Sequence, residues 1–162
     1  MRAALVVAGL LAATAASAAE CRQDRALYAD RDGGYELAFE PVGSNAAATS
    51  HHFKLKILAS GVVLDGVVMP GEPARSNGMA MYNCPEGDVT GEEIAACTVW
   101  EGVIYAFDGA GDASLLPEEG AVAAESLLLS GFGPSVRYSK LWDDGKASVA
   151  PWDVFIRKGC AA

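Results

Sequence analysis

Residues 52–58 read HFKLKIL, in which apolar Phe53, Leu55 and Ile57 alternate with Lys54 and Lys56. A strand sends successive side chains to opposite faces, so the apolar set shares one face and the lysines share the other. One buried and one solvated face is typical of a strand in an antiparallel sheet. We therefore predict such a strand here.

The segments on either side of this stretch also predict strands. Upstream, the turn signal DRDGG at residues 30–34 separates residues 26–28 from residues 35–39, which predicts a hairpin. Downstream, residues 62–69 are apolar on both faces and are interrupted only by Asp65 and Gly66. That pattern predicts a central strand with a kink or bulge, or else a tight hairpin.

The remainder of the chain adds strands and a helix. Residues 79–84, 98–107 and 152–157 are rich in residue types that β-structure accepts. Pro117, followed by two acids, predicts a helix start, and Gly131 predicts its end. A further helical turn is expected at residues 134–139. The sequence thus predicts an α+β fold that is mainly β, an antiparallel sheet or small barrel of about six to eight strands. One covering helix is expected near residues 117–130.

The N-terminus has the features of an export signal. Arg2 precedes the apolar residues 3–13, and the small residues Ala16-Ser17-Ala18 follow. The apolar run is shorter than the ~20 residues of a transmembrane helix. We expect a cleaved signal peptide at residues 1–18, with the bond one residue later as an alternative. A single globular domain at residues 19–162 is then expected in the periplasm of a bacterium or secreted from it, with no stable membrane anchor.

Four cysteines remain after such cleavage, and an even count in an oxidising compartment favours two disulfides. Three pairings are possible. We favour Cys84 with Cys97, which closes an acidic loop, and Cys21 with Cys160, which ties the ends of the domain together.

The charge balance narrows the class of partner. The chain has 12 Lys and Arg against 21 Asp and Glu, a net charge of −9, and loss of Arg2 would make it −10. A negative field repels nucleic acid and attracts basic proteins or metal cations. We therefore expect no nucleic-acid partner. A basic envelope protein is one partner that the charge would suit, and the alternative is that the acidity only keeps an exported protein soluble.

One segment predicts an anion or ligand site. Glycines before a helical start can expose backbone N–H groups to an anion, and a basic side chain nearby would complete the site. The alternative is an ordinary turn between helices, with Phe132 as a plug in the core. The residues of the candidate site are Gly131, Gly133, Ser135, Arg137 and Tyr138.

A second candidate site would bind a metal. His51 and His52 are the two histidines of the chain, and Met79 and Met81 share one face of a predicted strand. Imidazole and thioether groups are ligands for Cu(I). Against this, neighbours on a strand point to opposite faces, and methionine at alternate positions is commonly core filler. No bound cofactor is predicted beyond this.

Motifs of hydrolytic enzymes are missing from the sequence, which has neither a Gly-x-Ser-x-Gly elbow nor a His-Glu-x-x-His helix. No characterised family is recognised. The leading hypothesis is a non-catalytic binding or accessory protein of the bacterial cell envelope. The alternatives are a periplasmic copper-binding protein and a hydrolytic enzyme without a recognisable motif.

Overall fold

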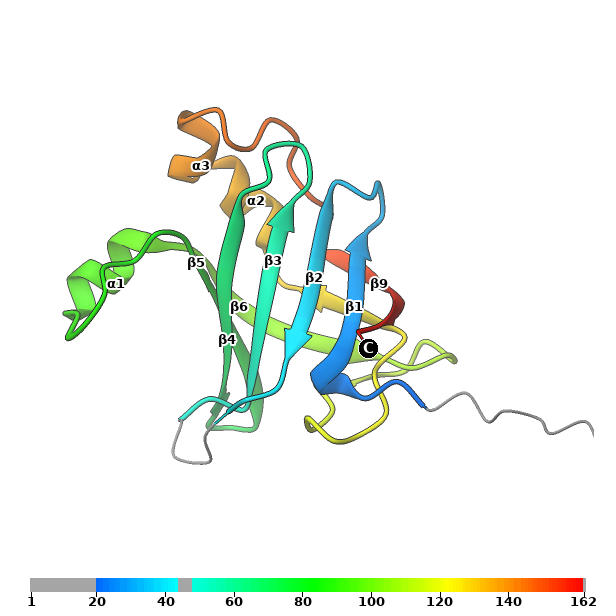
Figure 1. The fold of residues 1–162 in the computed structure, drawn as a ribbon. Coiled ribbons are helices and arrows are strands. Elements are labelled where there is room, and N and C mark those ends of the chain that lie inside the picture. The colour runs from blue at the N-terminus through cyan, green and yellow to red at the C-terminus, as the bar shows by residue number, and fades with distance from the viewer. Residues whose placement is uncertain (1–19, 44–47, 162) are drawn as a thin grey trace, which may run out of the picture.

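A closed antiparallel barrel of eight strands forms the body of the protein in the computed structural model, which describes residues 20–43 and 48–161 (Figure 1). Each strand pairs with the next one along the ring, and pairing of β5 with β6 completes the closure. The ring strands are β1 (Ala26–Asp30), β2 (Tyr35–Glu40), β3 (His51–Ile57), β4 (Val63–Gly71), β5 (Arg75–Met81), β6 (Thr98–Phe107), β8 (Ser126–Leu129) and β9 (Val154–Cys160). A ninth strand, β7 (Ala113–Leu115), pairs with β6 outside the ring. The predicted mainly β fold is confirmed.

Strand β3 behaves as its sequence predicts. Phe53, Leu55 and Ile57 are buried inside the barrel, and Lys54 pairs with Asp65 on the outside. Strand β4 runs through residues 65 and 66 without a register shift, so the bulge and the tight hairpin are both wrong. Gly66 is needed because Phe53 lies directly opposite, and a Cβ there would sit 2.1 Å from the Phe53 ring. The barrel is thus filled by aromatic rings that glycines on neighbouring strands accommodate.

The helix predicted at residues 117–130 is wrong. Residues 126–129 form β8, which pairs with β6 on one side and with β9 on the other. Leu127 and Leu129 are buried while Leu128 between them is half-buried, a period of two. Pro117 and its acids begin a loop across the end of the barrel instead. Closure of the ring requires a strand at this place, and that tertiary pairing overrides the local helix signals.

Short helices lie at the ends of the barrel and beside it. The helices α2 (Phe132–Arg137) and α3 (Lys140–Asp143) cover one end, where Phe132, Val136 and Leu141 are buried. The 3₁₀ helix η1 (Gln23–Arg25) lies at the opposite end. Helix α1 (Gly91–Cys97) stands away from the barrel (Figure 1).

Both predicted disulfides are confirmed. Cys21 bonds to Cys160 and so joins the segment before β1 to the end of β9, with 5.6 Å between the Cα atoms. Cys84 bonds to Cys97 and closes the loop that contains α1. None of the helices in the described part of the chain is long and apolar enough to cross a membrane. The expected signal peptide lies outside the described residues.

Candidate functional site

The amides of the predicted anion site bind a carboxylate of the protein itself. Gly131 has φ of +72° and precedes α2. Its N–H donates to Asp153 Oδ2 at 2.9 Å, and the N–H of Gly133 donates to Asp153 Oδ1 at 2.7 Å. Asp153 comes just before β9, 20 and 22 residues away in the sequence. The N–H groups that an external anion would need are therefore already used.

The other residues of that candidate site have separate partners. Ser135 Oγ donates to the carbonyl of Gly131 at 2.8 Å. The Arg137 guanidinium lies over the Trp142 ring, 4.2 Å from its centroid, and Tyr138 is 85% exposed. Phe132 between the glycines is fully buried, as the alternative of a core plug proposed. The segment thus holds α2 and α3, which together we call the helical cap, to β9.

We expect Asp153→Asn to lower the free energy of unfolding by about 1–3 kcal/mol, because the amide has one acceptor oxygen where the carboxylate accepts from both half-buried N–H groups. Urea unfolding followed by tryptophan fluorescence measures the loss. Asp143→Asn is the matched control, since Asp143 is an exposed carboxylate at the end of α3 in the same cap. Equal stability of the two variants would show that the carboxylate does not hold the cap.

The proposed metal ligands are not brought together. His51 points into the barrel, where its Nε2 donates to the carbonyl of Pro117 at 2.8 Å and its Nδ1 lies 3.0 Å from Ser50 Oγ. His52 points outward, and strand β4 separates it from Met79 on β5. Strands lie about 4.8 Å apart, so His52 and Met79 are roughly 10 Å from each other. Among the described residues, no group of three His, Cys, Asp or Glu side chains could hold a metal ion.

His51 makes stability depend on pH. Burial lowers the pKa of its imidazole from 6.5, although the Pro117 carbonyl and the charges of Glu119 and Asp24 oppose the shift. The unfolded chain therefore binds the proton first as the pH falls below 6.5. The contribution of neutral His51 to the free energy of unfolding is thus fully present above that pH and is lost below it.

Urea unfolding at pH 7.5 and pH 5 measures this loss. We expect a smaller loss in His51→Gln than in the wild type, whereas His52→Gln, which leaves His51 in place, keeps the wild-type loss. Parallel losses in all three proteins would assign the proton to other groups.

A groove of about 670 Å³ lies between the helical cap and the loop closed by Cys84 and Cys97. Its apolar lining includes Tyr82, Val99 and Leu141, and its charged lining includes Glu93, Lys140 and Lys146. Two residues of the predicted ligand site, Ser135 and Tyr138, also line it. A groove of this volume can hold a protruding side chain or a small ligand.

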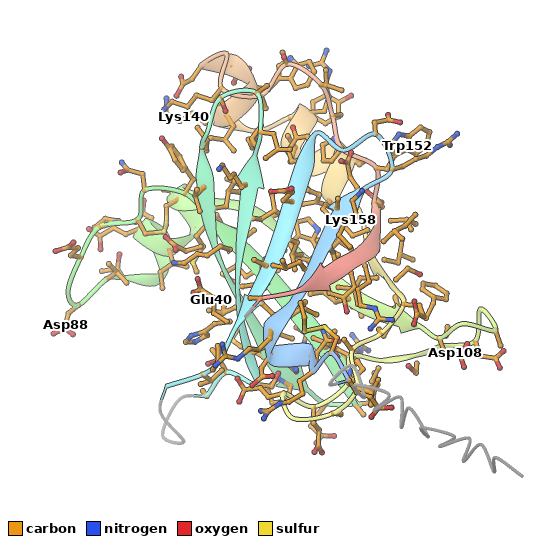
Figure 2. The ribbon with its side chains drawn as sticks, turned by 45° about the vertical axis from the view of Figure 1, so that its right-hand side comes forward. Glu40, Asp88, Asp108, Lys140, Trp152 and Lys158 are labelled. Carbon is orange, nitrogen blue, oxygen red and sulfur yellow. A yellow bond between two sulfur atoms is a disulfide. The ribbon has the colours of Figure 1, made fainter. Side chains whose placement is uncertain are left out.

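We call residues 85–96 the acidic arm. They contain Glu86, Asp88, Glu92 and Glu93 and no Lys, Arg or His. Figure 2 shows Asp88 at the tip of this arm, far from the barrel. No residue of α1 is buried. The arm therefore projects its carboxylates into solvent at one edge of the groove.

Two local features hold the acidic arm in shape. The disulfide closes its base, and Thr90 with Glu93 forms a capping box at the start of α1. The Thr90 N–H donates to the Glu93 carboxylate at 2.8 Å, and this hydrogen bond lowers the pKa of Glu93. The carboxylates of the acidic arm are thus presented on a preorganised loop.

The opposite wall of the groove carries cations that already have partners. Lys140 and Lys146 lie 3.4 and 3.7 Å from the carboxylate of Asp144, and Lys146 also lies over the Tyr82 ring. In contrast, no ion pair among the described residues involves Glu86, Asp88 or Glu92. The charges that lack an ion-pair partner beside the groove are therefore the carboxylates of the acidic arm.

The groove was not predicted from the sequence. Its walls come from the segment after β5, the acidic arm, the start of β6 and the helical cap, which are distant in the chain. The available signal was the loop between Cys84 and Cys97, which was noted for its disulfide but not as one wall of a site.

No protein-family model, no curated protein and no solved structure matches this chain.

Proposed function

We propose that this protein is a non-catalytic binding protein of the bacterial cell envelope, and that its acidic arm and the adjoining groove dock a basic protein. The observation that carries the proposal is the arm, which presents four carboxylates and no cation on a loop closed by a disulfide. The expected export signal and the two disulfides support the envelope as its location.

Charge favours a basic partner over other classes. The excess of acids over bases attracts cationic proteins from a distance and repels phosphate backbones. At short range, Glu86, Asp88 and Glu92 have no cation within an ion-pair distance among the described residues. A lysine or arginine of a partner would therefore pair with them without breaking an internal salt bridge.

The groove adds a place for apolar contact beside those charges. Tyr82, Val99 and Leu141 give it an apolar lining. Interfaces commonly combine an apolar centre with charges that steer and orient the partner. A basic partner that inserts a side chain into the groove would place its cations against the arm.

The test is capture from an envelope extract, identification of the protein recovered, and measurement of its Kd with purified material. The arm variant carries Glu86→Gln, Asp88→Asn and Glu92→Gln and leaves the capping residue Glu93 intact. The matched control carries Glu36→Gln, Glu40→Gln and Glu101→Gln, which remove the same charge from exposed positions on the barrel wall.

We expect a basic partner whose Kd rises by at least about 10-fold in the arm variant and by less than about 2-fold in the control. Binding should also weaken between about 0.05 and 0.5 M salt because exposed charges are screened. Recovery of no protein at either salt, or equal binding by the two variants, would overturn the proposal.

A further inference from the structure

Aromatic rings and cations lie together at the groove and the helical cap. The Lys146 ammonium lies over the Tyr82 ring, 4.8 Å from its centroid. The Arg137 guanidinium lies over the Trp142 ring at 4.2 Å. A cation is attracted to the face of an aromatic ring when it lies within about 6 Å of the ring centroid. Two rings in this region therefore already hold a cation of the protein itself.

The third ring of this region, that of Tyr138, is different. It lines the groove and is 85% exposed, more than any other large hydrophobic side chain in the described part of the chain. Arg137 is stacked on Trp142, so its guanidinium lies 6.0 Å from the Tyr138 centroid, at the outer limit of a cation–π contact. The ring of Tyr138 is thus open to a cation from outside.

The backbone of Tyr138 is held in place although its side chain is exposed. Its N–H donates to the carbonyl of Pro134 at 3.1 Å. Val136 and Ser139 on either side of it are buried. A tyrosine side chain has few rotatable bonds, so a ring on a fixed backbone loses little freedom when a partner binds it. Tyr138 is therefore preorganised for a contact that the fold itself does not use.

From these observations we infer that the ring of Tyr138 binds a lysine or arginine side chain of the basic partner. The inference rests on the proposed function and adds a specificity-determining residue to the same site. Pro85 and Ala96 of the acidic arm line the same groove as Tyr138. A basic segment drawn to the carboxylates of the arm therefore crosses the groove and brings a further cation to this ring.

The protein binds one of its own cations by the same combination of groups. Lys146 lies over the Tyr82 ring and 3.7 Å from the carboxylate of Asp144. The ring covers the apolar stem of such a side chain, while the carboxylate pairs with its charge. At the docking site, Tyr138 supplies the ring and the acidic arm supplies the carboxylates.

The charge of Arg137 gives the inference a second consequence. A cation on the Tyr138 ring would be repelled by Arg137, whose guanidinium lies 6.0 Å from the same ring. Arg137→Gln should therefore bind a cationic peptide at least about 2-fold more tightly than the matched variant Lys158→Gln. Lys158→Gln removes the same charge from an exposed position on β9. Equal affinity of these two variants would contradict a cation at Tyr138.

The test is an NMR titration of the isotopically labelled protein with a hexaarginine peptide that is acetylated and amidated, in about 0.05 M NaCl. The backbone amide signals give the Kd and show where the peptide binds. Tyr138→Leu keeps an apolar side chain but removes the ring, and Tyr138→Phe keeps the ring without its hydroxyl. Tyr105→Leu is the matched control, because Tyr105 is an exposed tyrosine on β6 that does not line the groove.

We expect the peptide to shift the amide signals of Tyr138 and of the acidic arm. The Kd should rise at least about 3-fold in Tyr138→Leu, and by less than about 2-fold in Tyr138→Phe and Tyr105→Leu. A Kd of Tyr138→Leu equal to that of the wild type, or no binding of the peptide, would overturn the inference.

The arm variant, titrated with the same peptide, separates this inference from the proposed function. If the arm variant binds more weakly and Tyr138→Leu binds like the wild type, the arm docks cations and the role of Tyr138 is wrong. If only Tyr138→Leu binds more weakly, Tyr138 binds the cation and the role of the arm is wrong. Capture of a basic protein from the envelope extract decides the proposed function independently of the peptide.

Discussion

Replacing Cys21 and Cys160 together by serine is expected to lower the free energy of unfolding by about 5 kcal/mol. The bond joins residues 139 apart, so its loss frees nearly the whole described chain in the unfolded state. It also lies where β1 meets β9, with Ala26 opposite Cys160 at the end of the ladder. Small domains have a total stability of about 5–15 kcal/mol, so the loss takes a large share of it.

Urea unfolding without reductant, followed by tryptophan fluorescence, measures this effect. The control is the pair Cys84→Ser and Cys97→Ser, which opens a loop with a sequence separation of 13. The chain-entropy argument predicts about 3 kcal/mol for that shorter loop. If the short loop cost as much as the long one, loop length would not account for the stabilisation.

The second large effect is expected at Phe132, where substitution by alanine should cost about 3–5 kcal/mol. The ring is fully buried where the helical cap meets the barrel. It makes edge contacts with Tyr35, Trp100 and Phe155, at centroid distances of 6.2, 5.7 and 5.9 Å. Three rigid rings cannot collapse into the space that it leaves, so the cavity persists.

The same urea measurement on Tyr138→Ala provides the comparison. Tyr138 is an aromatic residue of the same cap, but 85% of it is exposed. We expect its removal to change stability by less than about 0.5 kcal/mol. A loss below about 1 kcal/mol for Phe132→Ala would mean that the cap refills the space, contrary to the packing argument.

Several elements were predictable because their signals are local. The alternation of Phe53, Leu55 and Ile57 with lysines predicted β3, and the turn at residues 30–34 predicted the hairpin of β1 and β2. Both of these predictions need only residues that are close in sequence. The even count of cysteines favoured two disulfides but left three pairings possible, and the structure shows the favoured one.

The candidate sites were less predictable because their partners lie far apart in the chain. The sequence predicts that the N–H groups of Gly131 and Gly133 face an anion, whereas in the structure they donate to the carboxylate of Asp153, 20 and 22 residues away. The groove needs the arm, the start of β6 and the cap to converge.

By itself the sequence determined the β-rich class, the acidic balance and the period of β3. Only the tertiary structure decided which cysteines pair, that residues 126–129 are a strand, and that His51 and His52 lie on opposite sides of the barrel wall. The physical reason is closure. A strand in a ring must satisfy its backbone hydrogen bonds on both edges, so the pairings across the ring outweigh a proline and two acids that locally favour a helix.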